Sequence, residues 1–128
     1  MNDWLVVLGR VGLSWIFLSS GWGKIAAYAG TQQYMESAGV PGILLPVVIA
    51  LEIGGGLAIL LGFFTRPVAL ALAVFSIVSA ILFHLPHFAD QMQAINVWKN
   101  LAMAGGFCVL AAHGAGRYSI DAKRSRSL

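Results

Sequence analysis

Four long apolar runs, separated by short segments rich in glycine, proline and polar residues, dominate this chain. The runs cover residues 4–29, 46–64, 67–85 and 96–114. A helix needs about 20 residues to cross roughly 30 Å of hydrocarbon, and each run is long enough or nearly so. The pattern therefore predicts four transmembrane helices.

The connections between the runs predict how these helices are arranged. The turn at residues 64–67 is too short for anything but an antiparallel pair, and Pro67 suits the first turn of a helix. Pro86 ends the third run and Gly114 ends the fourth. We expect one all-α domain over residues 1–128, a transmembrane antiparallel four-helix bundle. The polar and apolar residues mixed in the two longer connections favour short interfacial helices there.

Small residues should mark the places where the helices touch, because lipid is as apolar as the helices and does not push them together. The second run carries a small residue at every fourth position, and the third run carries a similar series. We predict helix contacts along both lines: Ala50, Gly54, Ala58 and Gly62 in the second run, and Ala69, Ala73, Ser76 and Ala80 in the third.

Composition supports the membrane assignment and excludes an ordinary soluble domain. Hydrophobic residues make up 59% of the chain and charged residues only 10%, whereas a soluble domain carries about a quarter charged residues. The mean hydropathy is +0.81. A globule of 13.6 kDa could not hide so much apolar surface. The lipid bilayer is therefore the expected partner.

The basic residues are distributed unevenly, and this predicts the orientation. Of eight lysines and arginines, four lie in a tail at residues 115–128 and one is Arg66 in the short turn, while the connections at 30–45 and 86–95 contain none. Lysine and arginine are enriched on the cytoplasmic side of membrane proteins. We expect both termini in the cytoplasm and no nucleic-acid partner. The tail either lies against anionic headgroups or is a solvated segment that orients the protein.

Four ionisable residues interrupt the apolar runs: Arg10, Lys24, Glu52 and Lys99. A charge within the hydrocarbon costs several kcal/mol unless it is paired or hydrated. The expected topology places the last three in the outer half of the membrane, together with His84, and Arg10 alone in the inner half. Its expected partners are Ser14, Ser76 and the carbonyl groups at helix ends.

Glu52 is the centre of the expected polar site. On a helix, Gly55 and Gly56 fall within 60° of it, which leaves room for a partner or a ligand. We predict that Glu52 pairs with Lys24 and that Lys99 is close enough to compete. Two interpretations remain open. The pair either fixes the register of the helices, or belongs to a pocket that binds a polar or redox-active head group.

Metal and thiol chemistry are not expected. His84, His87 and Asp90 have a spacing typical of metal ligands on one helix, but Pro86 breaks the helix between the histidines. Cys108 is the only cysteine, so neither a disulfide nor a dithiol can form within the chain.

The order of these residues resembles that of the DoxX family of small bacterial four-helix membrane proteins, over nearly the whole chain. The segments that carry the resemblance are Arg10-x-x-Leu13-x-x-x-Phe17-x-x-x-Gly21-x-x-Lys24, Gly39-Val40-Pro41, Glu52-x-x-Gly55-Gly56 with Thr65-Arg66, Asn96-x-x-Lys99-Asn100-x-x-x-x-Gly105-Gly106 and Gly114-x-Gly116-x-x-Ser119-x-Asp121. The resemblance implies an inner-membrane location. It also implies a relation to the membrane subunit of a thiosulfate:quinone oxidoreductase and, in some members, resistance to quinones, catechols or thiol stress. An enzymatic role, as an oxidoreductase subunit, rests on this resemblance alone.

Three functions fit these observations. In the first, the protein binds a quinone-like ligand and supports membrane redox chemistry or detoxification. The ligand-binding candidates are then Arg10, Lys24, Glu52, His84, Lys99 and Asn100, with apolar walls from Phe17, Ile59, Phe63 and Met103. In the second, the protein is a non-enzymatic membrane scaffold or assembly factor for partner proteins. A membrane redox partner protein or further copies of this chain are the possible protein partners. The third is a small transporter.

Overall fold

The computed structural model describes residues 2–127, except for the side chains of residues 126 and 127, so Arg126 of the basic tail lies outside the described side chains. Within this range the chain is helical and has no strand. The α-helices are α1 (Asp3–Ala26), α2 (Tyr28–Ser37), α3 (Leu45–Leu61), α4 (Thr65–Ser79), α5 (Gln91–His113) and α6 (Ile120–Ser127). Shorter turns are η1 (Gly42–Leu44), the π-helical η2 (Ala80–His84) and η3 (Leu85–His87).

Four segments are long and apolar enough to cross a membrane: Asp3–Ala26, Gly42–Leu61, Thr65–His87 and Gln91–His113. They correspond to the four apolar runs, so the predicted all-α fold with four membrane-spanning helices is confirmed. The protein is a multi-pass membrane protein.

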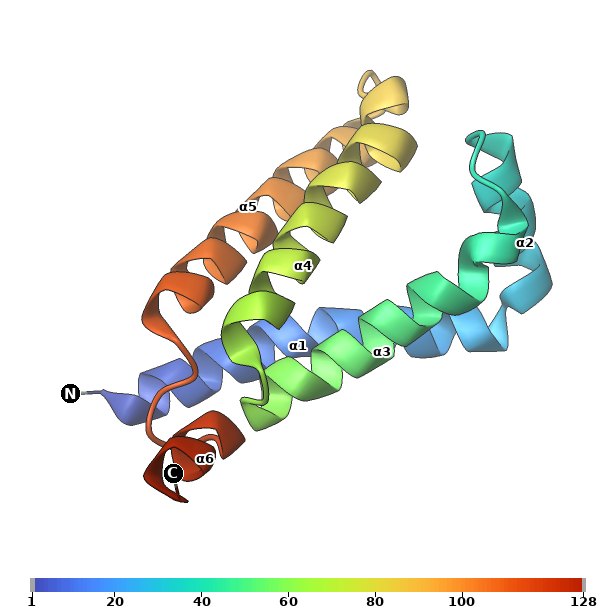
Figure 1. Cartoon of the computed structure of the whole chain (residues 1–128). Helices are drawn as coiled ribbons and strands as arrows, with labels where there is room; N and C mark the ends of the chain where they lie inside the picture. The colour runs from blue at the N-terminus through green and yellow to red at the C-terminus, as the bar shows by residue number, and fades with distance from the viewer. Residues whose placement is uncertain (1, 128) are drawn as a thin grey trace.

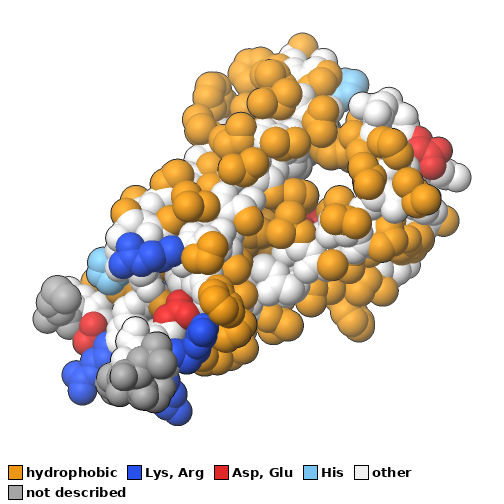
Figure 2. Space-filling model, in the orientation of Figure 1, with side chains coloured by type: hydrophobic (Ala, Val, Ile, Leu, Met, Phe, Trp, Pro, Cys, Tyr) orange, Lys and Arg blue, Asp and Glu red, His pale blue; other side chains and the backbone are white. Residues whose placement is uncertain are grey.

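The four spans form two antiparallel pairs (Figure 1). Helix α1 packs mainly on α3, and α4 packs mainly on α5. The pairs meet at the end that holds both termini, which we call the basal end, and diverge toward the opposite, distal end. The space-filling view shows a hollow between the diverging pairs (Figure 2). The bundle is therefore closed at one end and open at the other.

Several helix ends differ from those predicted, and the local chemistry explains them. Helix α5 begins at Gln91 rather than residue 96, because the Asp90 carboxylate caps it by accepting hydrogen bonds from the backbone N–H groups of Met92 and Gln93. Helix α3 ends before Gly62, whose φ of 70° is favourable only for glycine. Helix α1 ends at Ala26 rather than residue 29. The short helix α2 follows it, in one of the two connections where an interfacial helix was expected.

The predicted line of small residues is confirmed in the third span, but in α3 it is wrong for Ala50 and Gly54, which are exposed. All four members of the line in the third span are buried: Ala69, Ala73 and Ser76 in α4, and Ala80 in η2. In α3, a methyl group added at Gly54 would meet no atom within 4 Å, whereas Gly55 and Gly56 face the side chains of Leu72 and Leu18. The contact face of α3 is thus the face that carries Glu52. The room left by Gly55 and Gly56 is taken up by the side chains of Leu72 and Leu18.

Two glycines provide a matched test of this packing. A methyl group at Gly21 would lie 2.6 Å from Cγ1 of Ile53, whereas at Gly54 it would enter open space. We expect Gly21→Ala to lower the free energy of unfolding by about 1–3 kcal/mol, because the helices must move apart. Gly54→Ala should raise it by up to about 1 kcal/mol, because alanine favours the helix. Denaturant titration in mixed micelles would measure both. Equal effects would contradict the assignment of the contact face.

The C-terminal segment packs on the basal end rather than extending as a free tail. The Asp121 carboxylate accepts hydrogen bonds from the backbone N–H groups of Phe64 (2.8 Å) and Thr65 (2.9 Å), where α4 begins. The backbone N–H of Asp121 in turn donates to the carbonyl of Gly62. Burial raises the pKa of Asp121, but the hydrogen bonds from Thr65 and Phe64 and the charge of Arg124 outweigh it and hold the pKa below its ordinary value.

This lowered pKa predicts that α6 detaches in acid. The stabilisation from Asp121 is fully present above roughly pH 4, the ordinary pKa of an aspartate, and is lost as the pH falls through the lower value of the folded protein. A dye attached through Ser125→Cys, in a Cys108→Ala background, should gain rotational freedom over that range. With Asp121→Asn, the dye should be mobile already at pH 7 and show no such transition. An unchanged acid transition in the variant would contradict the assignment.

Candidate functional site

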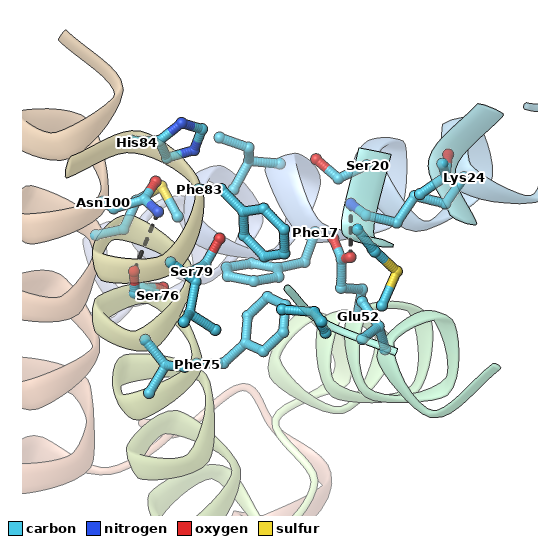
Figure 3. A pocket seen from close by; sticks show the side chains of 18 of the residues that line it. Phe17, Ser20, Lys24, Glu52, Phe75, Ser76, Ser79, Phe83, His84 and Asn100 are labelled. Atoms are coloured by element: carbon cyan, nitrogen blue, oxygen red, sulfur yellow. Dashed lines mark hydrogen bonds and ion pairs between the residues drawn. The ribbon is translucent and has the colours of Figure 1, made fainter. Parts of the chain in front are cut away.

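A cleft of about 330 Å³ lies between the two helix pairs, and residues from all four spans, α2 and η2 line it. Five of the six residues predicted for the site lie in this cleft: Lys24, Glu52, His84, Lys99 and Asn100. Residues more than 70 positions apart in the chain are thus brought together, as Figure 3 shows for most of them.

The predicted pair of Glu52 and Lys24 is confirmed. Nζ of Lys24 lies 2.7 Å from Oε1 of Glu52, and the Glu52 side chain is only 2% exposed. Gly21 lies against Glu52 Cβ and Ile53, so its missing side chain lets α1 and α3 approach closely at this level. Because a carboxylate inside a membrane protein is costly unless it is paired, the ammonium group of Lys24 offsets part of the cost of burying Glu52.

The opposite wall of the cleft carries a second polar group. Asn100 is 5% exposed, and its Nδ2 donates a hydrogen bond of 3.0 Å to the carbonyl of Ser76. Nδ1 of His84 lies 2.6 Å from Oε1 of Gln93, which ties η2 to α5. Lys99 lines the cleft beside Asn100 and makes no ion pair with any described residue. The predicted competition between Lys99 and Lys24 for Glu52 is therefore not seen.

Aromatic side chains line the cleft between the two polar walls. The rings of Phe17, Phe75 and Phe83 stand between Glu52 and Asn100 (Figure 3). Tyr34 of α2 stacks on Phe83 with ring centroids 5.4 Å apart, so this contact joins the two helix pairs across the cleft. The cleft is thus apolar in the middle and polar at two opposite sides.

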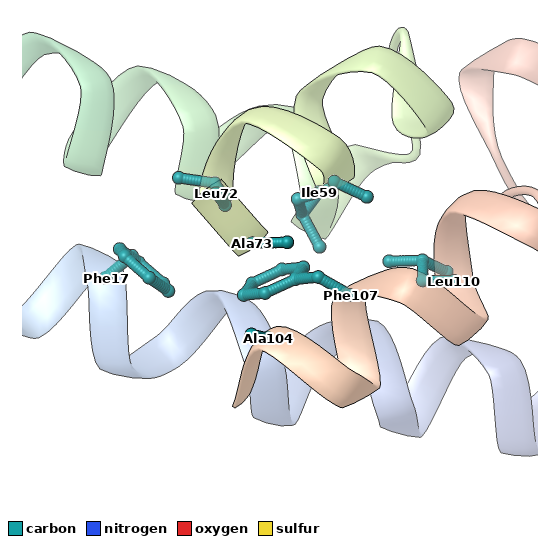
Figure 4. Close-up of a cluster of buried hydrophobic side chains, with 8 residues drawn as sticks. Phe17, Ile59, Leu72, Ala73, Ala104, Phe107 and Leu110 are labelled. Carbon is teal, nitrogen blue, oxygen red and sulfur yellow. The ribbon is translucent and has the colours of Figure 1, made fainter. Parts of the chain in front are cut away.

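The predicted apolar walls are only partly correct. Phe17 and Met103 line the cleft. Ile59 belongs instead to the hydrophobic core, where it packs with Phe107 and Leu110 (Figure 4), and Phe63 lies at the basal end beneath Arg124.

Other lining residues were missed by the sequence reasoning: Ser20, Tyr34, Phe75, Ser79 and Phe83. Phe75, Ser79 and Phe83 follow one another at four-residue spacing before His84, and this period was the signal that could have identified them.

Arg10 is not part of the cleft. It is 3% exposed and lies near the basal end, where its guanidinium donates hydrogen bonds to four carbonyl groups. The acceptors are the carbonyls of Ile59 (3.0 Å), Leu60 (2.8 Å), Ala115 (2.8 Å) and Tyr118 (2.8 Å). The predicted helix-end carbonyls are thus correct partners. Ser14 and Ser76 are not, because each hydroxyl donates to a carbonyl of its own helix.

The donor set of the cleft suits organic oxygen atoms rather than metal ions. No group of three or more His, Cys, Asp or Glu side chains placed to hold a metal occurs among the described residues. The cleft instead offers ammonium, amide and hydroxyl donors around aromatic rings. Such an arrangement can hold a flat, apolar molecule that carries oxygen atoms at its edges.

Comparison with known proteins agrees with this architecture. The family model described as DoxX matches residues 5–85. The chain is similar to inner membrane protein YqjF of Escherichia coli (strain K12), with 52% identity over 121 residues that cover 94% of this chain and 92% of that protein. It is also similar to inner membrane protein YphA of the same organism, with 36% identity over 125 residues that cover 91% and 88%. No solved structure matches.

Proposed function

This chain belongs to the DoxX family, and from that membership and the cleft we propose that the protein binds the head group of a quinone-like molecule that enters from the bilayer. The observation that carries the proposal is the placement of hydrogen-bond donors on two opposite walls with aromatic rings between them. A quinone ring presents the complementary pattern, a flat apolar body with an oxygen atom at each end. Binding of this kind would support membrane redox chemistry or the detoxification of quinones and catechols.

Each wall has a distinct part in this proposal. Lys24, held by Glu52, would donate to one ring oxygen from the α1 side. Asn100 and Lys99 would donate to the other from the α5 side. The apolar tail of the ligand would leave the cleft where the helix pairs diverge. In an oxidoreductase, the chain would act as a membrane subunit that positions the quinone for a redox partner protein.

Quinone content provides the direct test. Ser79 lies inside the cleft, whereas Val109 is 69% exposed on the outer surface of α5. We expect lipid extracts of protein purified in mild detergent to contain a quinone. Ser79→Phe, which fills the cleft with a ring, should reduce the amount about tenfold, and Val109→Phe, the matched control, should not. A lack of quinone in the unaltered protein, or equal amounts in both variants, would refute the proposal.

A scaffold role is the second candidate, and the lipid-facing glycines favour it. A methyl group added at Gly9, Gly12, Gly54 or Gly105 would meet no atom within 4 Å, so these glycines are not used for packing within the chain. Small residues let helices of separate chains approach closely. Co-purification of a stoichiometric protein partner, or of further copies of this chain, without any quinone would favour this function.

We further propose that the protein resides in the inner membrane with both termini in the cytoplasm. Two similar proteins are named inner membrane proteins. Basic side chains gather at the basal end, at the start of α4 and after α5: Arg66, Arg117, Lys123 and Arg124. The distal connections contain no lysine or arginine. Reporter enzymes that work only in the cytoplasm should therefore be active when fused to either terminus, and inactive fusions would reverse the orientation.

A further inference from the structure

The charges that line the cleft do not balance. The lining includes two lysines and one carboxylate, Lys24, Lys99 and Glu52. Lys24 and Glu52 neutralise each other at 2.7 Å. Lys99 therefore adds one positive charge that no carboxylate of the cleft offsets.

The carboxylates outside the cleft are in other places. Of the five acidic side chains in the chain, Asp3 begins α1 and Asp121 caps α4, both at the basal end. Asp90 caps the start of α5 with hydrogen bonds to backbone N–H groups. Glu36 lies against Gly42 beside η1. None of these four carboxylates forms an ion pair with Lys99.

Lys99 is exposed in the structure, so its unpaired ammonium group is accessible to a ligand. It lies eight residues after the first residue of α5, which corresponds to about 12 Å along the helix. Its neighbour Asn100 is almost fully buried. A lysine at such a depth either extends its side chain to the headgroups or pairs with an anion. The cleft lies beside it, and Ser79 and Asn100 are polar groups in the same lining.

We infer that the cleft selects amphiphiles whose head group carries a single negative charge, either a carboxylate or an ionised ring hydroxyl, with Lys99 as the counter-ion. The inference rests on the proposed function in that it places the ligand in the same cleft. It adds the charge of the ligand and the residue that recognises this charge. A neutral quinone would bind through hydrogen bonds alone, and an acidic one would bind more tightly.

Two pairs of matched probes test the inference, in a Cys108→Ala background that removes the thiol able to add to a quinone ring. The first pair is 2-hydroxy-1,4-naphthoquinone, whose hydroxyl is ionised at neutral pH, and its neutral 2-methoxy analogue. The second pair is 2-naphthoate and the neutral 2-naphthamide. Titration calorimetry in detergent should show about tenfold tighter binding of each anion, because hydrogen bonds to charged groups are stronger than neutral ones.

Variants of Lys99 identify the source of the preference. Lys99→Gln should bind both members of each pair equally, and Lys99→Arg should restore the preference for the anion. Arg66→Gln removes a basic side chain at the basal end, away from the cleft, and should leave the preference unchanged.

The outcomes separate this inference from the proposed function. Equal binding within both pairs, or a preference that survives in Lys99→Gln, would overturn the inference while quinone binding stands. A Lys99-dependent preference for 2-naphthoate with no binding of either quinone would support the inference and refute the quinone proposal. If none of the four probes bound, both would fail.

Discussion

Replacement of Lys24 by methionine is expected to lower the free energy of unfolding by about 3–5 kcal/mol, because it leaves the charge of Glu52 buried without a partner. Glu52→Met should lower the free energy of unfolding by less than this, because the remaining Lys24 is 30% exposed and can reach polar surroundings. In the double variant both groups are apolar, and its free energy of unfolding should lie within about 1–2 kcal/mol of that of the unaltered protein. Denaturant titration of the four proteins in mixed micelles, followed by circular dichroism, gives the coupling energy of the pair.

Lys99→Met is the matched control for this cycle. It removes a lysine from the same cleft, but one that makes no ion pair with any described residue, so we expect little change in stability. If the effects of Lys24→Met and Glu52→Met simply added in the double variant, the two groups would be uncoupled. The pair could then neither fix the helix register nor hold Lys24 for a ligand.

Arg10→Met is expected to lower the free energy of unfolding by about 3–5 kcal/mol and to release the C-terminal segment from the basal end. The guanidinium bonds two carbonyls at the end of α3 and two in the segment between α5 and α6, so its loss leaves four acceptors without this donor. Arg10→Lys should recover little of the loss, because an ammonium cannot present the planar fork of donors that reaches all four carbonyls. Thermal unfolding and the rate of proteolysis after α5 would measure the two effects.

Arg66→Met is the control for Arg10. Arg66 also donates to carbonyl groups, those of Ala111, Ala112 and His113, but these hydrogen bonds lie on the exposed surface. Loss of the Arg66 side chain should lower the free energy of unfolding by about 1 kcal/mol or less, because water replaces the donor. If Arg10→Lys left the protein as stable as the unaltered chain, the buried charge alone, and not the geometry of the fork, would hold the basal end together.

The spans and the central ion pair could be predicted from the sequence because a strong physical cost determines each. Lipid excludes unpaired backbone groups, so long apolar runs must be helices. An isolated carboxylate in such a run must find a cation, and the expected topology placed Lys24 and Lys99 at a similar depth. Both predictions depend on properties that a sequence displays directly.

The remaining features depend on relations between distant segments. The face of α3 that contacts its neighbours is turned away from Gly54 toward Gly55, because Leu72 and Leu18 project into the gaps on that side. The docking of α6 depends on Asp121 meeting the start of α4, more than 50 residues earlier. The spacing of residues along the sequence indicates neither the contacts of Gly55 and Gly56 nor the contact of Asp121 with the start of α4.

The stacking of Tyr34 on Phe83 has a kinetic consequence. These two rings, Tyr34 from α2 and Phe83 from η2, meet across the cleft, and each can move by rotation about its own side-chain bonds. Rotations of this kind take nanoseconds when the ring is partly exposed, far less time than the movement of a whole helix. Exchange of a guest molecule with the surrounding lipid should therefore be governed by how firmly the guest is held, and not by a slow opening of the protein.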